Sequence, residues 1–347
     1  MDGVVVAGME TLFRRPDRID AKLNVCTVLF NSVRYRARWK LTEDFIRQVE
    51  RHHNARVCVA EVAFGEREFV IASATDPYHL RLRTCHELFF KENALNLLFA
   101  RVMAADPEAE YFAWVDADTH LARYDWVDEA IHQLQHHPVV QLWSEMQDLT
   151  DEHEVLATGP SFVQTWQEGR KGEPGCHGAP GRQHLGPTGL GWAAIRAWIE
   201  GVGGLLDVCV VGSCDWWMGY ALIGRLEAAL AATGNHPGRK GRGTYHPDYV
   251  KAICEWERRT RLTQWKERPL QGNIGLVKGL ALHYFHGPKA DRRYQDREQI
   301  FIRHQFNPLT DLKRDVQGLW QLTADKPEMR RDLQRYYRGR NEDAPTR

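Results

Sequence analysis

The chain has 347 residues, 43% of them hydrophobic, and its 46 Lys and Arg residues balance 46 Asp and Glu residues, which gives a formal net charge of +0. This length allows one large domain or two modest ones. The neutral charge argues against a protein held to nucleic acid mainly by bulk charge, because nonspecific phosphate binding requires an excess of Lys and Arg. Seven scattered Cys residues without a Cys-x-x-Cys pair indicate reduced thiols. We find no signal-peptide pattern and no apolar stretch as long as a membrane span, so we expect a cytoplasmic protein.

The first hundred residues alternate predicted strands and helices. The hydrophobic patterns predict strands at 24–30, 57–63 and 69–72, and helices at 41–53, with Thr42 as its cap, and at 85–103. This alternation predicts a mostly parallel α/β sheet. Ligands of such sheets bind beyond the carboxyl ends of the strands, and Asn31 and Glu61 lie at or near such ends.

The stretch from 110 to 120 is the most informative part of the sequence. Residues 111–115 form an apolar run that predicts a short buried strand, and Asp116 and Asp118 follow it directly. Two carboxylates at the end of a buried strand repel each other unless a cation or a set of donors meets them. A hard divalent metal ion is the simplest such partner. The alternative is a polar strand end followed by a helix cap.

The middle of the chain has weaker patterns. They predict helices at 125–136 and 189–198, strands at 139–143 and 208–211, and a helix that begins at Asp215 and continues through residue 230. Residues 168–191 are rich in Gly and Pro and predict a long loop. Asp215 is either an N-terminal helix cap or a base that faces a sugar-like substrate.

The last third begins with a basic, Gly-rich segment at 234–243, either a surface loop or a loop that faces phosphate. A strand pattern at 273–282 runs into His283 and His286. The charged segment 291–347 predicts helices that wrap the main domain, with a frayed end after Asn341.

Taken together, these motifs resemble the nucleotide-sugar-dependent glycosyltransferases of the GT-A fold. Three anchors occur in the right order within residues 24–290: Asp116-Ala117-Asp118, the Gly-Gly segment 202–205 followed by Asp215, and His286-Gly287. More narrowly, the string at 283–297, the Lys-Glu-Asn at 91–93 and the Arg-Asn-Glu-Asp at 340–343 resemble a group of phage-associated glycosyltransferase-like proteins.

The resemblance implies an α/β fold with a GT-A, Rossmann-like, mostly parallel central sheet flanked by helices, and a C-terminal helical extension. The implied catalytic domain spans 1–290, with a nucleotide-binding half at about 22–150 and an acceptor half at about 150–290. Residues 291–347 are then a helical tail packed on that domain.

The resemblance also implies a metal-dependent glycosyltransferase. Asp116, Asp118 and His286 would hold Mn²⁺ or Mg²⁺, and the imidazole favours Mn²⁺. The ion would neutralise the diphosphate of a nucleotide-sugar donor, with a UDP-sugar as the expected donor. Further donor-binding candidates are Asn31, Glu61, Lys91, Asn93, Asp116, Lys289 and Arg293.

Asp215 would act as the general base if the enzyme inverts configuration. Cys214 departs from the pattern, because many inverting members have a second acid at that position. Trp192, Trp216 and Trp217 would stack on the sugar or on a nucleobase; core packing is the alternative.

The acceptor is predicted less sharply. The phage resemblance implies a hydroxymethylated pyrimidine in DNA, which would require base flipping, or a glycan or protein; a phage-encoded enzyme would act in the host cytoplasm. A DNA acceptor predicts that the basic residues 239–242 and the Arg-rich tail line one face beside the site.

Two other classes of protein stay open, a nucleotidyltransferase and a non-catalytic carbohydrate- or DNA-binding module. The first expects a Gly-rich loop after the first strand, and residues 31–34 contain no Gly.

Overall fold

The computed structural model describes residues 21–169, 185–233, 244–294 and 297–346. The N-terminal lead-in, the middle of the Gly-rich segment 168–191 and the basic segment 234–243 lie outside the described residues. The expectations stated for those segments, including a basic surface at 239–242, therefore stay predictions.

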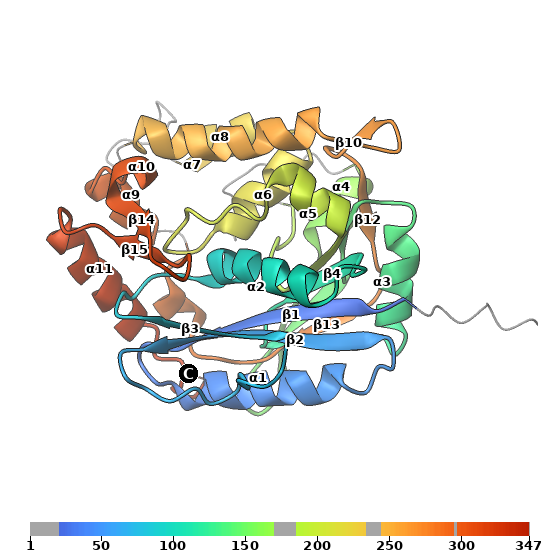
Figure 1. Cartoon of the computed structure of the whole chain (residues 1–347), viewed down its shortest axis with the longest axis horizontal. Coiled ribbons are helices and arrows are strands. Elements are labelled where there is room, and N and C mark those ends of the chain that lie inside the picture. The colour runs from blue at the N-terminus through green and yellow to red at the C-terminus, as the bar shows by residue number, and fades with distance from the viewer. Residues whose placement is uncertain (1–20, 170–184, 234–243, 295–296, 347) are drawn as a thin grey trace, which may run out of the picture.

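A seven-stranded sheet forms the centre of the molecule (Figure 1). Its strand order is β12 (Ile274–Leu276), β6 (Val139–Gln141), β9 (Gly191–Ile195), β4 (Tyr111–Val115), β1 (Leu23–Phe30), β2 (Ala55–Phe64) and β3 (His79–Thr84). Strand β9 is antiparallel to both of its neighbours, and the other pairings are parallel. The sheet is thus mixed and mostly parallel, which confirms the predicted α/β class.

Helices cover both faces of this sheet. Helix α1 (Arg36–Val49) lies below β1 and β2 in Figure 1, and α2 (Lys91–Ala105) lies above them. The remaining helices of this part are α3 (Trp126–Leu134), α4 (Phe162–Gln167), α5 (Arg196–Val202), α6 (Cys214–Leu222), α7 (Leu226–Thr233) and α8 (Pro247–Leu262). Most central strands are buried along their length, because helices bury both faces of a largely parallel sheet.

A second, four-stranded sheet lies at the carboxyl end of β4. Its order is β5 (Thr119–Leu121), β13 (Leu280–His283), β7 (Glu145–Leu149) and β8 (Val155–Pro160). The segment 273–282, expected as one strand, therefore forms β12 in the central sheet and β13 in this one. A separate two-stranded ribbon pairs β10 (Gln264–Trp265) with β11 (Arg268–Pro269).

The C-terminal region packs on the rest of the chain. It contains the 3₁₀ turn Lys289–Arg292, α9 (Gln299–Arg303), α10 (Pro308–Asp311), the hairpin β14 (Leu312–Arg314) and β15 (Trp320–Leu322), and α11 (Pro327–Arg338). The Tyr337 hydroxyl donates to the Val210 carbonyl at 2.9 Å, which ties α11 to the loop before α6. The expected fraying after Asn341 is wrong, because residues 341–343 bind the start of α1. The division into domains stays a prediction.

Five local expectations are wrong. The helix expected from Asp215 through residue 230 is interrupted at 223–225, where Gly224 has a φ of +68°, and forms α6 and α7 instead. Residues 191–195 form β9 rather than helix, because a short, fully buried apolar run fits a strand that lies between two others. Residues 69–72 form a loop whose amides bond Glu61, and residues 208–211 form no strand. Thr42 lies inside α1, where its hydroxyl donates to the Arg38 carbonyl at 2.7 Å.

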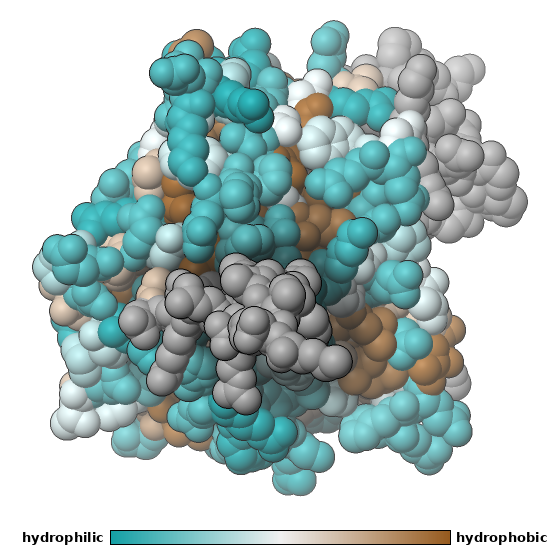
Figure 2. Space-filling model, turned by 90° about the vertical axis from the view of Figure 1, so that its right-hand side faces the viewer, coloured by the Kyte–Doolittle hydropathy of each residue, from teal (hydrophilic) through white to brown (hydrophobic). Residues whose placement is uncertain are grey.

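The side of the molecule on the right of Figure 1 is drawn in Figure 2. The surface there is mostly hydrophilic, with smaller hydrophobic areas between the polar side chains. Strand β1 begins on this side and runs toward the opposite one, where the C-terminus lies (Figure 1). No helix among the described residues is long and apolar enough to span a bilayer.

Candidate active site

A carboxylate and two imidazoles meet at the carboxyl end of β4. The ligand atoms of Asp118, His283 and His286 all lie within 4.8 Å of one another. Asp118 Oδ2 is 2.8 Å from His286 Nε2, and Asp118 Oδ1 is 3.8 Å from His283 Nε2. The two Nε2 atoms are 3.2 Å apart. One oxygen and two nitrogen donors in such a cluster are a suitable set for a transition-metal ion such as Mn²⁺.

Strand register explains why these residues meet. In the second sheet, His283 of β13 pairs with Thr119 of β5 on one side and with Asp148 of β7 on the other. The Tyr284 amide then donates to the Asp118 carbonyl at 2.8 Å. The chain therefore places a histidine from position 283 beside an aspartate from position 118.

The charge states of this group suit metal binding. Burial opposes the charge of Asp118, but His286, His283 and Arg292 hold the pKa of Asp118 well below its usual range. Burial and the charge of Arg292 lower the pKa of His286 to about 3. Asp118 is thus ionised and His286 neutral near pH 7. A metal ion bound at His286 Nε2 would require the neutral imidazole to carry its one proton on Nδ1.

Asp148 orients His283 from the far side. Its Oδ1 lies 2.7 Å from His283 Nδ1, and its Oδ2 pairs with the Lys289 ammonium. Burial opposes the Asp148 charge, but these contacts keep its pKa below the usual value. A carboxylate that holds the second nitrogen of a ligating histidine fixes the tautomer and the ring plane.

Asp116 has a different partner from Asp118. Its Oδ1 lies 2.5 Å from the Lys91 ammonium at the start of α2, and its Oδ2 accepts from the Leu190 amide at 3.3 Å. Burial opposes the charge of Lys91, but Asp116, Glu92 and Asp215 outweigh it and raise the pKa of Lys91. Asp116 therefore stands outside the cluster around Asp118 in this structure, and its predicted role as a metal ligand stays a prediction.

Asp215 faces the same space as Asp116. A Cβ placed on Gly189 would lie 2.9 Å from Asp215 Oδ2 and 3.9 Å from Asp116 Oδ2, so both carboxylates approach this one glycine. The Thr188 hydroxyl donates to Asp215 Oδ2 at 3.4 Å. Asp215 lies in the first turn of α6, where helix N-termini favour negative charge.

Glu92 is an acid of this region that the sequence did not single out. It is 3% exposed in the first turn of α2. Burial, opposed by Lys91 and reinforced by Asp215, raises the pKa of Glu92 to about 7. The neighbouring Cys214 is also buried, and burial raises the pKa of its thiol well above the usual value. An apolar helix position filled by Glu is the signal that was available in the sequence.

The Glu92→Gln variant is expected to be more stable than the wild type at pH 8 and similar to it near pH 4.5. The folded-state pKa of about 7 lies above the ordinary value of 4.5, so the folded protein binds the extra proton between these values. Stability therefore falls as pH rises through this window, by about 3 kcal/mol for this group. Denaturant melts of both proteins from pH 4.5 to pH 8 measure the difference. A difference independent of pH would contradict the prediction.

Three predicted donor-binding residues bond the chain itself. Asn31 donates to the Tyr35 carbonyl at 2.7 Å and accepts from the Tyr35 amide at 2.9 Å. Glu61 accepts from three backbone amides at 70–72, each at 2.8 Å. Asn93 accepts from the Trp320 amide at 2.9 Å and so holds the C-terminal hairpin. Their side chains shape loops in this structure, and donor contacts by them stay predictions.

The predicted basic residues divide between two places. Lys91 pairs with Asp116, and Lys289 pairs with Asp148, the aspartate that contacts His283. Arg293 is exposed, whereas the preceding Arg292 is 3% exposed and donates to the His286 carbonyl at 3.1 Å. Arg292 is therefore the arginine that the structure brings to the metal group, and the sequence did not distinguish the two.

The tryptophans mostly fill the interior. Trp192 is 5% exposed and donates to the Thr188 carbonyl at 2.7 Å, and Trp217 is fully buried and donates to Glu298 at 3.3 Å. Trp216 is half-buried and packs edge-on against Trp217, with ring centroids 4.7 Å apart. Core packing thus accounts for Trp192 and Trp217, and Trp216 is the one of the three with a partly open ring.

Comparisons with known proteins give distant structural likenesses. No protein-family model and no curated protein matches the sequence. Among solved structures, a putative nucleotide-diphospho-sugar transferase from Desulfovibrio desulfuricans G20 matches 37% of this chain and 59% of its own, at 12% identity and a TM-score of 0.22. A glycosyltransferase involved in the glycosylation of the major capsid of PBCV-1 matches 78% of this chain and 96% of its own, at 11% identity and a TM-score of 0.29. At these TM-scores the matches carry no conclusion about activity.

Proposed function

We propose that this protein is a metal-dependent glycosyltransferase that moves a sugar from a nucleotide-sugar donor, with a UDP-sugar as the first candidate, to a hydroxyl acceptor. The observation that carries the proposal is the convergence of two groups at the carboxyl end of β4. One is the metal-type cluster of Asp118, His283 and His286. The other is the set of Asp116, Lys91 and Asp215 around Gly189.

The residues have separate roles in this proposal. A bound Mn²⁺ or Mg²⁺ would act as a Lewis acid that stabilises the departing diphosphate. Asp118, His283 and His286 would hold the ion, and Asp148 would orient His283. This ligand set keeps the Asp118–His286 pairing expected from the sequence and substitutes His283 for Asp116.

Asp215 would position the acceptor hydroxyl and take its proton if the reaction inverts configuration. Lys91 forms an ion pair with Asp116, and the Lys91 ammonium also interacts electrostatically with Asp215. Arg292 adds a buried positive charge behind the metal ligands. A cation held by Asp118 and an acid near Asp116 suit a reaction in which the departing diphosphate gains negative charge and the acceptor hydroxyl loses a proton.

The acceptor class is a separate part of the proposal. A hydroxymethylated pyrimidine in phage DNA is the first candidate, and a glycan or protein hydroxyl is the second. Mass spectrometry of phage DNA nucleosides with and without the gene distinguishes them.

The test of the proposed activity is hydrolysis of common sugar nucleotides by the purified protein with Mn²⁺. We expect release of the nucleoside diphosphate that stops when EDTA is added and resumes when Mn²⁺ is restored. Absence of donor binding and hydrolysis across UDP-, GDP- and dTDP-sugars would overturn the proposal. Pyrophosphate release from a nucleoside triphosphate would indicate a nucleotidyltransferase, and glycan or DNA binding unaffected by EDTA would indicate a binding module.

A further inference from the structure

The last residues of the chain pass directly behind the metal-type cluster. We call residues 340–343 the C-terminal strap; it lies across Gly287, the residue that follows His286. A Cβ on Gly287 would lie 2.8 Å from the Asn341 carbonyl oxygen, 2.8 Å from Glu342 Cα and 3.0 Å from the Arg340 carbonyl oxygen. Gly287 also has a φ of +94°, which favours glycine. The turn after His286 is therefore shaped by the strap.

The strap is fixed on its other side to the start of α1. Both Asp343 oxygens accept amide hydrogens of the helix, from Arg36 and Ala37, each at 2.9 Å. Tyr35, the N-cap residue of α1, offers no side-chain cap of its own. Asp343 thus caps α1 from more than 300 residues away in the sequence, where a carboxylate is favoured by the free amides and the helix dipole.

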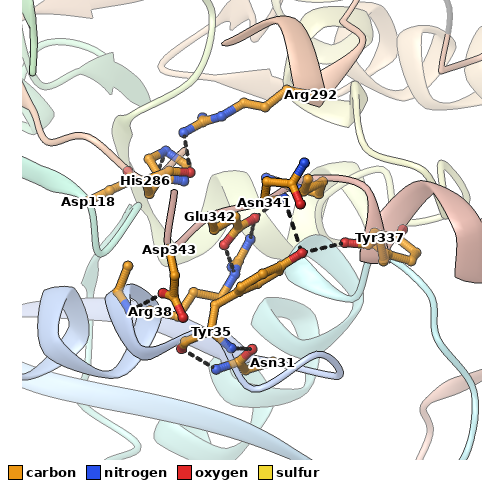
Figure 3. Close-up of polar contacts among 12 residues, drawn as sticks. Asn31, Tyr35, Arg38, Asp118, His286, Arg292, Tyr337, Asn341, Glu342 and Asp343 are labelled. Carbon is orange, nitrogen blue, oxygen red and sulfur yellow. Dashed lines mark hydrogen bonds and ion pairs between the residues drawn. The ribbon is translucent and has the colours of Figure 1, made fainter. Parts of the chain in front are cut away.

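Buried ion pairs hold the middle of the strap (Figure 3). Glu342 is 2% exposed, and its Oε1 accepts from Arg38 at 2.7 Å and lies 2.7 Å from Arg340 Nε. Burial opposes the Glu342 charge, but Arg38 and Arg340 outweigh it and lower the pKa of Glu342 to about 2. The strap is therefore anchored by charges that stay paired over the whole neutral range.

Tyr35 also joins the strap region to the start of α1, and Arg292 joins the backbone of His286 to α11 (Figure 3). The Tyr35 hydroxyl accepts from the Asn341 amide at 3.1 Å and donates to the Arg338 carbonyl at 3.0 Å. Arg292 donates to the His286 carbonyl at 3.1 Å, and the Tyr336 hydroxyl donates to the Arg292 carbonyl at 3.2 Å. The backbone at His286 and Gly287 is thus held by the C-terminal region on two sides.

His286 needs such support because it lies beyond the sheet. Strand β13 ends at His283, and the Tyr284 amide makes the last bond to the Asp118 segment. From these contacts we propose that the C-terminal strap is a positioning element of the metal centre, which holds His286 beside Asp118 through Gly287. The proposal rests on the proposed function in one respect, that the cluster binds a divalent ion.

The test compares Mn²⁺ affinity, measured by isothermal titration calorimetry, in variants of the full chain. Gly287→Ala inserts a methyl group between His286 and the strap, and Asp343→Ala removes the attachment to α1. We expect each to weaken Mn²⁺ binding, by about tenfold for Gly287→Ala, since loss of contacts that orient metal ligands costs about 10- to 100-fold in affinity. The matched control is Gly272→Ala, at a similar φ of +77° with nothing within 4 Å of the added methyl, and it should keep wild-type affinity.

A double variant distinguishes a loss of Mn²⁺ affinity caused through the strap from one caused by local backbone strain at position 287. If Gly287 acts through the strap, Gly287→Ala combined with Asp343→Ala weakens binding less than the product of the two single effects. The proposal would be overturned if the double variant lost the full product of the two single losses in Mn²⁺ affinity. It would also be overturned if Asp343→Ala bound Mn²⁺ with wild-type affinity. Asp343 is exposed, so this variant should fold, and a circular dichroism melt checks it. A wild-type protein that binds no Mn²⁺ would instead contradict the proposed function.

Discussion

Replacing Asp118 with Ala is expected to abolish Mn²⁺ binding and to reduce donor hydrolysis by about 10³-fold or more. Asp118 supplies the one carboxylate of the cluster and lies 2.8 Å from His286. Loss of the ion removes several kcal/mol of stabilisation of the departing diphosphate, and each 1.4 kcal/mol or so corresponds to a factor of about ten in rate. Calorimetry with Mn²⁺ and a diphosphate-release assay measure the two effects.

Asp325→Ala is the matched control, because Asp325 is an exposed acid in the C-terminal region. It should bind Mn²⁺ and turn over like the wild type. An Asp118→Ala protein that keeps EDTA-sensitive turnover would show that the ion is held elsewhere, with Asp116 as the next residue to replace.

Replacing Asp215 with Asn is expected to lower sugar transfer by about 10²- to 10⁴-fold while Mn²⁺ affinity stays unchanged. The substitution keeps the size of the side chain and removes its capacity to accept a proton, and general bases contribute factors of this size. Asp215 is not one of the three clustered ligand residues, so the metal should still bind. Transfer to an added acceptor and calorimetry with Mn²⁺ are the two measurements.

The ratio of sugar transfer to donor hydrolysis in Asp215→Asn shows whether Asp215 acts on the acceptor or on the donor. Water can replace the acceptor, so Asp215→Asn should retain more of its slow donor hydrolysis than of its transfer activity. Equal loss of both would indicate that Asp215 acts on the donor, as expected for a reaction that retains configuration. Lost Mn²⁺ binding would contradict the separation of the two groups.

The local part of the site could be predicted from the sequence. The apolar run at 111–115 marks a buried strand, and Asp116 and Asp118 directly after the run mark its end. Both features lie within ten residues of sequence, so no long-range contact is needed to recognise them. The pairing of Asp118 with His286 was implied by the resemblance to GT-A glycosyltransferases, and the two side chains are in contact in the structure. The roles assigned to these residues await the measurements above.

The partners supplied by long-range pairing could not be predicted in the same way. His283 reaches Asp118, and Asp148 reaches His283, because β13 pairs with β5 and β7, and His283 lies 135 residues after Asp148 in the sequence. Asn31 and Glu61 show the opposite error. Polar side chains at strand ends suggest ligand contacts, but here nearby backbone amides and carbonyls take up their hydrogen bonds. Periodicity carries no information on which of these outcomes occurs.

Strand β9 has a consequence for any attempt to divide this protein. It lies antiparallel between β4 and β6, so residues 191–195 complete a sheet whose neighbouring strands come from 111–141. A fragment ending at residue 150 would leave β4 with a bare, apolar edge and β6 without either of its partner strands, and such edges promote aggregation. The predicted nucleotide-binding half should therefore precipitate when it is expressed alone. A polypeptide still emerging from the ribosome faces the same hazard until residue 195 has been synthesised, which gives chaperones a defined interval in which to act.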